Sequence, residues 1–519
     1  MSLAFVLTEL ASELALFAAA GFLLFAIDDL AVDLIYFLRR AWRAIAVYSR
    51  YPRAFADTLP APARPGRIAV FIPAWDESAV IADMLRATLK RWGDGDYRIF
   101  VGFYANDPLT EAAIAQVADP RVEAVLVEDH GPTTKADCLN RLYDALQAAE
   151  CREHWTAKAV VLHDAEDLVH PLEIRLFDVM TERAALVQLP VIPLLDPESR
   201  WIAGHYCDEF AECHGKELVV REAVGASIPL AGVGCAIARD AIARLAADNG
   251  GRPFAAACMT EDYELGLRIG AFADKTMFLR IPAVPGSRAL VSSRGHFPAT
   301  LDAAVRQKSR WIGGIALAGW ERLGWRGGIG ERWMRMRDRR GPLAALLLVA
   351  GYAAIVLWLQ LWIASLLGAP VTLSVSPVLA FLLTVNAGLL AWRVVVRAGF
   401  VTATYGIGQG LRSIPRLLVG NLISILAVKR AIGIHASPLL TNLLWINAWL
   451  LGWRLLMRFS FTTAAYGFGE GLRSVPRLVV GNVVAILAAR RALALHEAGG
   501  PHQWDKTRHV FPTREVMLR

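Results

Sequence analysis

The chain has 519 residues, of which 55% are hydrophobic and only 20% are charged, and its mean hydropathy is +0.38. This composition excludes intrinsic disorder and argues against a wholly soluble protein, because soluble domains carry less apolar material. The net charge of +7 suits a membrane protein with basic cytoplasmic flanks. None of the six cysteines forms a CxxC pair, which indicates reduced thiols and neither a disulfide framework nor a zinc site.

The N-terminal segment, residues 1–55, predicts a transmembrane helix followed by a cytoplasmic interface. Residues 16–27 are strongly apolar and, with the residues before them, approach the ~20 positions that a helix needs to cross the hydrocarbon. No basic residue precedes Arg39, so the segment is not a secretory signal peptide. Arginines then cluster between 39 and 53, which places this end in the cytoplasm and the N-terminus in the periplasm.

Between residues 64 and 325 the pattern is that of an α/β domain. Short runs rich in Val and Ile alternate with amphipathic stretches, which is typical of a mostly parallel, Rossmann-like sheet covered by helices. The expected strands are 67–73, 97–104, 122–127 and 159–163, and the expected helices are about 78–91, 109–117 and 134–148. We therefore expect a cytosolic sheet domain inserted between transmembrane helices, with ligands bound beyond the carboxyl ends of the strands.

Carboxylates follow all four of these strands where they end. Asp76 and Glu77 follow the first strand, Asp107 follows the second, Glu128 and Asp129 follow the third, and Asp164 and Glu166 follow the fourth. Helix capping would explain any one of them, but together they predict a binding cleft, because crowded carboxylates need a cation. The Asp164/Glu166 pair supplies the hard oxygen ligands that suit Mg²⁺ or Mn²⁺.

Two further groups of residues lie later in the domain. Glu261 and Asp262 stand at a predicted helix start, where a carboxylate aimed into the cleft can act as a general base; capping by the preceding threonine is the alternative. Gln307, Arg310 and Trp311 share one face of a predicted helix. Arginine can pair with a diphosphate and an indole offers a flat platform, whereas an amphipathic helix at the membrane interface is the alternative.

The C-terminal apolar region, residues 342–496, predicts a helical membrane domain. It begins with the uncharged stretch 342–369, which is long enough to span and follows a basic amphipathic linker at 326–341. A 61-residue tandem repeat then covers about 372–432 and 433–493. Each copy combines an apolar helix, an arginine-rich exit and a PRxxxGN helix.

The number of membrane crossings within the repeat stays open. If both PRxxxGN helices are cytoplasmic, the apolar helix at 437–453 does not cross the membrane only once. Either this helix re-enters the membrane, or residues 417–428 also cross it, or one of the two basic helices is not cytoplasmic. Residues 497–519 are expected to form a cytoplasmic tail.

These motifs, in this order, resemble the family 2 glycosyltransferases, which have a GT-A fold and transfer a sugar from a nucleotide-sugar donor with inversion. The resemblance implies that Asp164 and Glu166 bind a divalent cation, and that Asp262 is the base, with Glu261 and Arg310 beside it. It also implies a set of substrate-binding residues: Pro73, Asp76, Glu77, Asp107, Lys135, Asn140, Asp164, Gln307, Arg310 and Trp311.

The layout of the whole chain is similar to the bacteriophage adsorption protein B group of bacterial inner-membrane transferases. The shared features are DDLxxDL after the first span, HDAEDLVHP, the PRxxxGN helices and the closing WDKTRH. We therefore expect a multi-pass inner-membrane hexosyl- or N-acetylhexosaminyl-transferase that polymerises a cell-surface or secreted polysaccharide. Its expected partners are a UDP-sugar, a glycan or lipid-linked acceptor and the lipid bilayer, with an outer-membrane export partner left open.

Other functions remain open at this point. One is the transfer of a single sugar to a lipid-linked acceptor, without polymerisation. Another is a non-catalytic membrane scaffold for surface-polysaccharide or phage-receptor assembly. A nucleic-acid protein is not expected, because the positive charge gathers at the membrane exits and no nucleic-acid motif is present.

Overall fold

The structure, a computed structural model, describes residues 3–405 except 201, 257, 259, 273, 370 and 372–374, together with 464, 466, 467, 488–492 and 495. Most of the predicted tandem repeat, including 437–453, and the predicted tail at 497–519 lie outside the described residues. The chain divides into two compact units. The helical unit comprises Met1–Trp42, Ser199–Glu217 and Arg340–Ala489, and the α/β unit comprises Arg43–Glu198, Leu218–Arg339 and Arg490–Arg519.

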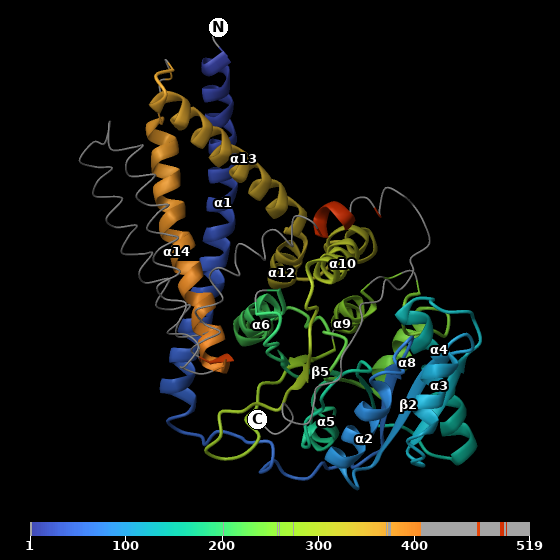
Figure 1. The fold of residues 1–519 in the computed structure, drawn as a ribbon. Coiled ribbons are helices and arrows are strands. Elements are labelled where there is room, and N and C mark those ends of the chain that lie inside the picture. Colours follow the sequence, from blue (N-terminus) through green and yellow to red (C-terminus); the bar gives the residue numbers. More distant parts are fainter. Residues whose placement is uncertain are drawn as a thin grey trace. The chain divides into compact units, whose positions relative to one another are not determined.

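The α/β unit is built on a seven-stranded sheet, of which β2 and β5 are labelled in Figure 1. Its strand order is β3-β2-β1-β4-β7-β5-β8. Strands β3, β2, β1 and β4 run parallel, β7 is antiparallel to both of its neighbours, and β5 and β8 are again parallel. A parallel pair, β6 and β9, forms a separate small sheet. The strands are β1 Ile68–Pro73, β2 Tyr97–Tyr104, β3 Val122–Val127, β4 Ala159–Leu162, β5 Leu186–Gln188, β6 Val191–Pro193, β7 Cys235–Ala238, β8 Thr276–Phe278 and β9 Ser293–Gly295.

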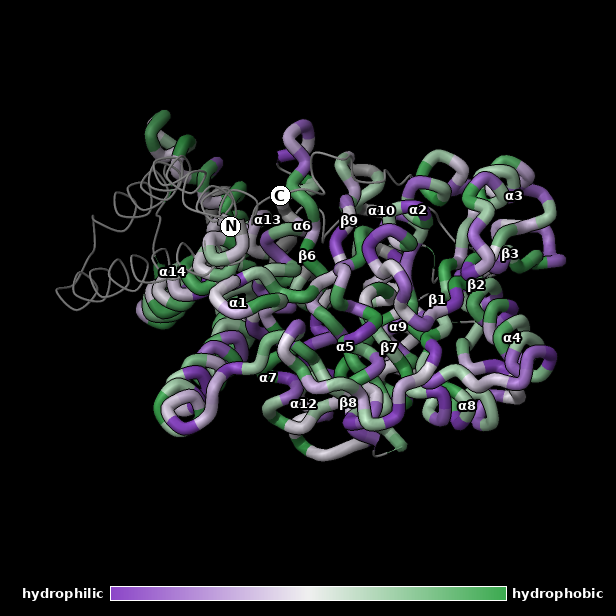
Figure 2. Tube along the Cα trace, turned by 90° about the horizontal axis from the view of Figure 1, so that it is seen from below, coloured by the Kyte–Doolittle hydropathy of each residue, from purple (hydrophilic) through white to green (hydrophobic). Residues whose placement is uncertain are grey.

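Helices cover both faces of this sheet, which confirms the expected mostly parallel α/β architecture. Figure 2 shows α2 and α3 on one side of β1, β2 and β3, with α4 and α8 on the other. The helices of the unit are α2 Ile81–Trp92, α3 Pro108–Ala115, α4 Lys135–Glu153, α5 Glu173–Met180, α7 Leu218–Ala223, α8 Arg239–Asp248, α9 Glu261–Ala271, α10 Leu301–Ile312, α11 Gly319–Leu323 and α12 Ile329–Arg339.

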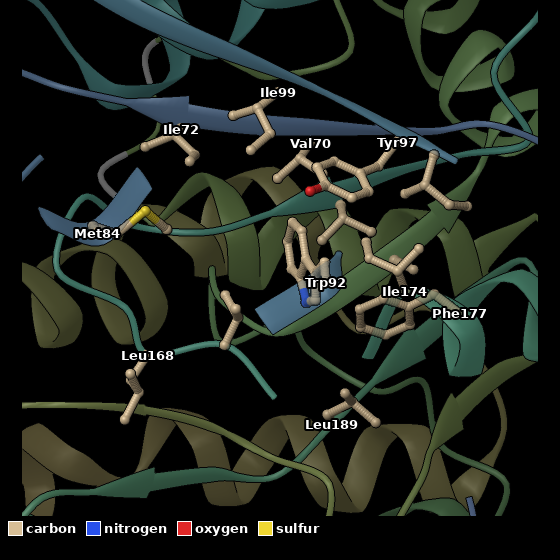
Figure 3. Packing of buried hydrophobic residues seen from close by; sticks show 14 of the residues in the cluster. Val70, Ile72, Met84, Trp92, Tyr97, Ile99, Leu168, Ile174, Phe177 and Leu189 are labelled. Carbon is tan, nitrogen blue, oxygen red and sulfur yellow. The ribbon is translucent and has the colours of Figure 1, made fainter. Parts of the chain in front are cut away.

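The central strands are buried along their whole length, because helices pack on both of their faces. Every residue of β1 is buried, and its alternate side chains Val70 and Ile72 join Trp92 of α2 and Phe177 of α5 in one large core (Figure 3). On the other face, α4 approaches β2 so closely that a Cβ on Gly102 would lie 2.4 Å from the Cys138 sulfur. Alternate side chains of these strands thus point into two different helical layers.

The helical unit combines helices from three separated parts of the chain: α1 Leu3–Trp42, α6 Ile202–Glu212 with the π-helical turn Cys213–Glu217, α13 Gly341–Leu366 and α14 Pro377–Tyr405. Among the described residues, two segments are long and apolar enough to cross a membrane by length and composition: Leu10–Val47 and Pro377–Thr404. Helix α13, with 26 uncharged residues, packs against α1, where a Cβ on Gly21 would lie 2.4 Å from Leu347.

Acidic residues of α1 hold the helical unit together through buried ion pairs. Arg340 binds Asp28 at 2.7 Å and Asp29 at 2.5 Å. Lys216 binds Asp33 at 2.6 Å, and both side chains are less than 5% exposed. Trp392 also donates from its indole nitrogen to Asp33 at 2.6 Å. The three acids of the DDLxxDL segment therefore connect α1 to the two other parts of the helical unit, Ser199–Glu217 and the part that begins at Arg340. Buried charges of this kind require such partners.

Candidate functional site

The carboxyl ends of the parallel strands lie at one edge of the sheet. In the strand register, Pro73 of β1 stands beside Gly102 of β2, and Phe71 stands beside Leu162 of β4. Residues that follow these strands are therefore brought together, although up to 90 residues separate them along the chain. This is the edge at which open α/β sheets bind ligands.

The turn after β1 is fixed by Asp107. Asp76 has a positive φ of 55°, which costs energy for a residue other than glycine, and its backbone N–H donates to Asp107 Oδ2 at 2.6 Å. The other oxygen of Asp107 accepts from the Thr110 N–H at 3.3 Å and caps α3. Asp107 is buried and engaged by backbone, whereas the Asp76 side chain is exposed. The capping interpretation thus holds for Asp107, which orients Asp76.

Lys135 lies at the first position of α4 and pairs with the acidic turn after β4. Thr134 and Asp137 form a capping box that fixes this helix start. The Lys135 ammonium then reaches Asp164 Oδ1 at 2.5 Å. The Asp164 side chain is 32% exposed, so this ion pair lies at the rim of the sheet edge and is open to a ligand.

Glu261 and Asp262 in the first turn of α9 face the same lysine. A Cβ on Gly232 would lie 2.6 Å from Asp262 Oδ2 and 3.5 Å from Lys135 Nζ, so these two groups flank the same glycine. Gly232 also has a φ of +79°, and both the backbone and the crowding therefore require glycine there. The structure thus brings Lys135, Asp164, Glu261 and Asp262 together.

The electrostatics of this cluster follow from burial and from an excess of negative charge. Burial, with the neighbouring Asp262, raises the pKa of Glu261 to about 7. Burial also raises the pKa of Asp262 above its ordinary value, although Lys135 and Arg310 oppose the shift. Burial alone would lower the pKa of Lys135, but the carboxylates around it raise it. Lys135 is therefore charged at neutral pH.

Arg310 on α10 acts electrostatically on two carboxylates of this cluster. Its positive charge opposes the rise in the pKa of Glu261 and of Asp262 that burial causes. Gln307 is partly buried on the same helix, and its Oε1 atom has no hydrogen-bond partner among the described residues. The ring of Trp311 carries the Lys308 ammonium 5.0 Å from its centroid. A flat ring and an amide oxygen on this helix thus remain candidates for contact with a substrate.

Three of the predicted substrate-binding residues are buried in the structure. Asn140 is buried, and its amide makes two hydrogen bonds to the backbone of Phe254, at 2.8 and 3.0 Å. Glu77 is also buried, and its N–H donates to the Thr110 hydroxyl at 3.0 Å. Pro73 ends β1 with its side chain buried. These three residues therefore belong to the packing of the sheet edge.

The turn that carries Asp164 and Glu166 is supported by a buried histidine. His163 Nδ1 lies 2.8 Å from Asp167 Oδ2, and His163 Nε2 lies 3.0 Å from Glu173 Oε1. Asp167 Oδ2 also accepts from the Asp164 N–H at 3.1 Å. Burial alone would lower the pKa of His163, but Glu173 and Asp167 raise it to about 10. A charged imidazole thus stabilises the turn through Asp167, which also binds the Asp164 backbone.

Two residues of this arrangement are not indicated by the sequence motifs. Gly232 belongs to the short pattern AGVGC, in which a pair of glycines just before a strand is a weak signal. His163 belongs to the HDAEDLVHP motif, which does not distinguish a supporting residue from a ligand. Gly232 packs against Asp262 and Lys135, which lie far away in the chain. His163 binds Asp167 and Glu173, which lie a few residues further along.

The metal prediction rests on donor chemistry and charge. No group of three or more His, Cys, Asp or Glu side chains is arranged to bind a metal within the described part of the chain. Asp164 and Glu166 offer two hard carboxylates, and a Mg²⁺ or Mn²⁺ ion there would take its other ligands from water or phosphate. The surplus of carboxylates over cations around Lys135 is compatible with such an ion.

Comparison with known proteins identifies the α/β unit. Residues 65–314 match the family model described as "Glycosyltransferase like family 2". This chain contains a family 2 glycosyltransferase domain. The mostly parallel sheet is accordingly the Rossmann-like sheet of a GT-A fold. The resemblance drawn from the sequence motifs is therefore confirmed at the level of the family and the fold.

Two curated relatives match beyond the transferase domain. Bacteriophage adsorption protein B from Escherichia coli (strain K12) is 36% identical over 436 residues, which cover 78% of this chain and 57% of the relative. Bacteriophage N4 adsorption protein B from Escherichia coli O157:H7 matches with the same identity and coverage. The chain thus spans little more than half the length of these relatives.

Solved structures are more distant. A mannosyltransferase, PcManGT from Pyrobaculum calidifontis, in complex with GDP-Man and Mn²⁺, is 18% identical, with a TM-score of 0.47 over 74% of this chain and 96% of the other. Glucosyl-3-phosphoglycerate synthase from Mycobacterium tuberculosis, in complex with Mn²⁺, UDP and phosphoglyceric acid, is 18% identical, with a TM-score of 0.31 over 51% of this chain and 80% of the other.

The charged histidine beneath the acidic turn predicts a pH-dependent contribution to stability. Because the pKa of His163 is about 10 in the folded protein and 6.5 when unperturbed, its stabilisation is fully present below pH 6.5 and is lost as the pH rises through 10. We expect His163→Asn to lower the thermal midpoint of the purified chain. The difference from wild type should be largest near pH 6 and should shrink toward pH 10. A difference that is constant or grows with pH would contradict this account.

Proposed function

We propose that the chain is an inverting glycosyltransferase of the bacterial inner membrane that uses a nucleotide-sugar donor. The observation that carries the proposal is the convergence of Lys135, Asp164, Glu261 and Asp262, with Arg310 acting on the last two, at the carboxyl edge of a family 2 domain. This arrangement offers cations to a diphosphate and a buried carboxylate to an acceptor hydroxyl. Both are needed to displace a nucleoside diphosphate from a sugar.

Asp262 is the proposed base. The acceptor oxygen forms a bond to the anomeric carbon while the bond from that carbon to the diphosphate oxygen breaks, and the acceptor proton passes to the Asp262 carboxylate. Burial raises the pKa of Asp262, which strengthens it as a base. The diphosphate leaves with the electron pair of the broken bond. Attack from the opposite side inverts the anomeric carbon.

The leaving diphosphate is stabilised by positive charge on the protein. Arg310 can bind phosphate oxygens through paired N–H donors, and Lys135 supplies a second, compact charge. Asp76, exposed at the end of β1, is the proposed contact to the nucleoside. A divalent ion, Mg²⁺ or Mn²⁺, held by Asp164 and Glu166, would neutralise further charge on the diphosphate. Gln307 and Trp311 are the proposed contacts to the sugars.

The donor and the product are proposed by analogy with the family. A UDP-sugar is proposed as donor and a hexose or N-acetylhexosamine as the sugar. The QxxRW arrangement of Gln307, Arg310 and Trp311 beside apolar helices supports chain building on a glycan acceptor. Transfer of a single sugar to a lipid-linked acceptor would give a product of fixed length, so product length separates the two.

The assignment of the base leads to a direct test. We expect Asp262→Asn to lower turnover by roughly two to four orders of magnitude, because no carboxylate then takes the proton from the attacking hydroxyl. Release of nucleoside diphosphate from a panel of nucleotide-sugars by the purified full chain, with Mn²⁺ or with a chelator, measures it. Asp94→Asn is the matched control, because Asp94 is exposed before the amino end of β2.

Donor binding should survive the Asp262→Asn change. Near-normal transfer by this variant would eliminate Asp262 as the base. A wild-type chain that binds nucleotide-sugars but turns none of them over would instead favour the scaffold function for surface-polysaccharide or phage-receptor assembly.

Membrane attachment with a cytoplasmic transferase domain is the second part of the proposal. Support comes from the apolar helices α1 and α14, the uncharged helix α13 and the arginines that follow α1. In this arrangement the nucleotide-sugar, which is made in the cytoplasm, reaches the sheet edge directly. The N-terminus would lie in the periplasm.

Cys151 allows this topology to be measured. It is the exposed one of the six cysteines and lies near the end of α4. We expect a membrane-impermeant maleimide to leave Cys151 unlabelled in intact spheroplasts and to label it after the membrane is opened. Cys151→Ser controls for labelling at the other cysteines. Labelling of Cys151 in sealed spheroplasts would place the domain outside and overturn the proposed location.

A further inference from the structure

The residue after the proposed base, Tyr263, anchors α9 to helix α12. Tyr263 is buried, and its hydroxyl donates to Asp338 Oδ2 at 2.7 Å. Burial and the nearby Asp338 raise the pKa of Tyr263 well above its ordinary value, so the hydroxyl keeps its proton and remains a donor. Successive helix residues point about 100° apart, so a contact that fixes Tyr263 also fixes the direction of Asp262.

Asp338 is itself held in place by a buried arginine. The Nη1 atom of Arg221 donates to both oxygens of Asp338 at 2.8 Å, and the Arg221 side chain is only 4% exposed. The Nε atom of Arg221 also donates to the Ser227 carbonyl at 2.6 Å. These charge-assisted bonds hold both carboxylate oxygens, so Asp338 presents a fixed acceptor to Tyr263.

The segment 227–232 lies along α9 and leaves it little freedom to move sideways. A Cβ on Gly266 would lie 2.4 Å from the Ile228 carbonyl oxygen, and a Cβ on Gly270 would lie 2.0 Å from Ser227 Oγ. At the other end of this segment, Gly232 lies against Asp262. This close backbone packing sets the distance between α9 and the segment 227–232. The rotation of α9 about its own axis depends instead on side-chain contacts.

The acceptor of the tyrosine bond sits on α12, a helix that is itself fixed within the α/β unit. Glu331 accepts from the Ser227 N–H at 2.7 Å and pairs with Arg335 at 2.7 Å. The Arg339 guanidinium lies 4.7 Å from the ring centroid of Trp325 and 5.2 Å from that of Trp320. In the chain, a single residue separates the end of α12 from α13.

We propose that Tyr263 and Asp338 are positioning residues that set the rotation of α9, and thereby aim the Asp262 carboxylate at the acceptor hydroxyl. The proposal rests on the proposed function of Asp262 as base. It assigns to α12 a part in catalysis without contact to substrate. It also makes the presentation of the base depend on the helix that leads directly into α13.

Tyr263→Phe tests this with a minimal change, because only the hydroxyl is lost. We expect kcat to fall roughly tenfold, the effect of losing one hydrogen bond that acts in the transition state, while KM for the donor stays within about twofold. Asp338→Asn should lower kcat in the same way. Tyr97→Phe is the matched control: Tyr97 is equally buried, and its hydroxyl donates to the Gly93 carbonyl at 3.3 Å, far from α9 in the chain.

A double variant separates positioning from general structure. If Tyr263 acts through Asp262, then adding Tyr263→Phe to Asp262→Asn should cause no further loss of kcat. Equal losses of kcat in the two backgrounds, or a Tyr263→Phe variant that behaves like Tyr97→Phe, would overturn the proposal. Rates are divided by the amount of bound nucleotide, so that partial unfolding is not mistaken for a loss of kcat. A Tyr263→Phe variant that yields less nucleotide-binding protein but has a normal kcat per site would also overturn the proposal.

The two proposals fail in distinguishable ways. If Asp262→Asn retains transfer, the base assignment is wrong whatever Tyr263 does. If Asp262→Asn abolishes transfer and Tyr263→Phe leaves kcat unchanged, the base stands and only its positioning by Tyr263 and Asp338 is rejected.

Discussion

Lys135 supplies the positive charge that allows Asp164, Glu261 and Asp262 to crowd together at one edge of the sheet. Without it, three carboxylates from two distant parts of the chain would repel one another in a partly dehydrated site. Its 2.5 Å pair with Asp164 and its effect on the pKa of Asp262 and Glu261 join the turn after β4 to the start of α9. The remaining excess of negative charge favours a site that binds cations and phosphates together.

Much of the sheet could be predicted from local patterns. The expected strand 67–73 is β1 from Ile68 to Pro73, and the expected strand 97–104 is β2 over the same residues, because short apolar runs bounded by polar turns are a local signal. The chemical identities of Asp164, Asp262 and Arg310 were also recognisable by motif. Their convergence follows from strand register, since parallel strands end at the same edge.

Other features depend on contacts between residues far apart in the chain, which spacing does not encode. Asn140 was expected at the substrate, yet its amide binds Phe254, 114 residues away. The segment Ser199–Glu217 interrupts the predicted transferase domain and packs in the helical unit, where Lys216 meets Asp33, 183 residues away. Such partners are chosen by the folded arrangement, and a single sequence does not reveal them.

The position of the bound nucleotide decides whether Lys135, Asp164 and Asp262 form the active site. A cryo-electron microscopy map of the full chain with a nucleoside diphosphate and Mn²⁺ tests this most directly. The account predicts diphosphate density within hydrogen-bond distance of Lys135 or Arg310, with the metal beside Asp164 and the Asp262 carboxylate facing the open side of the diphosphate. A nucleotide bound away from the carboxyl edge of β1 and β4, or an Asp262 carboxylate turned away from it, would contradict the account.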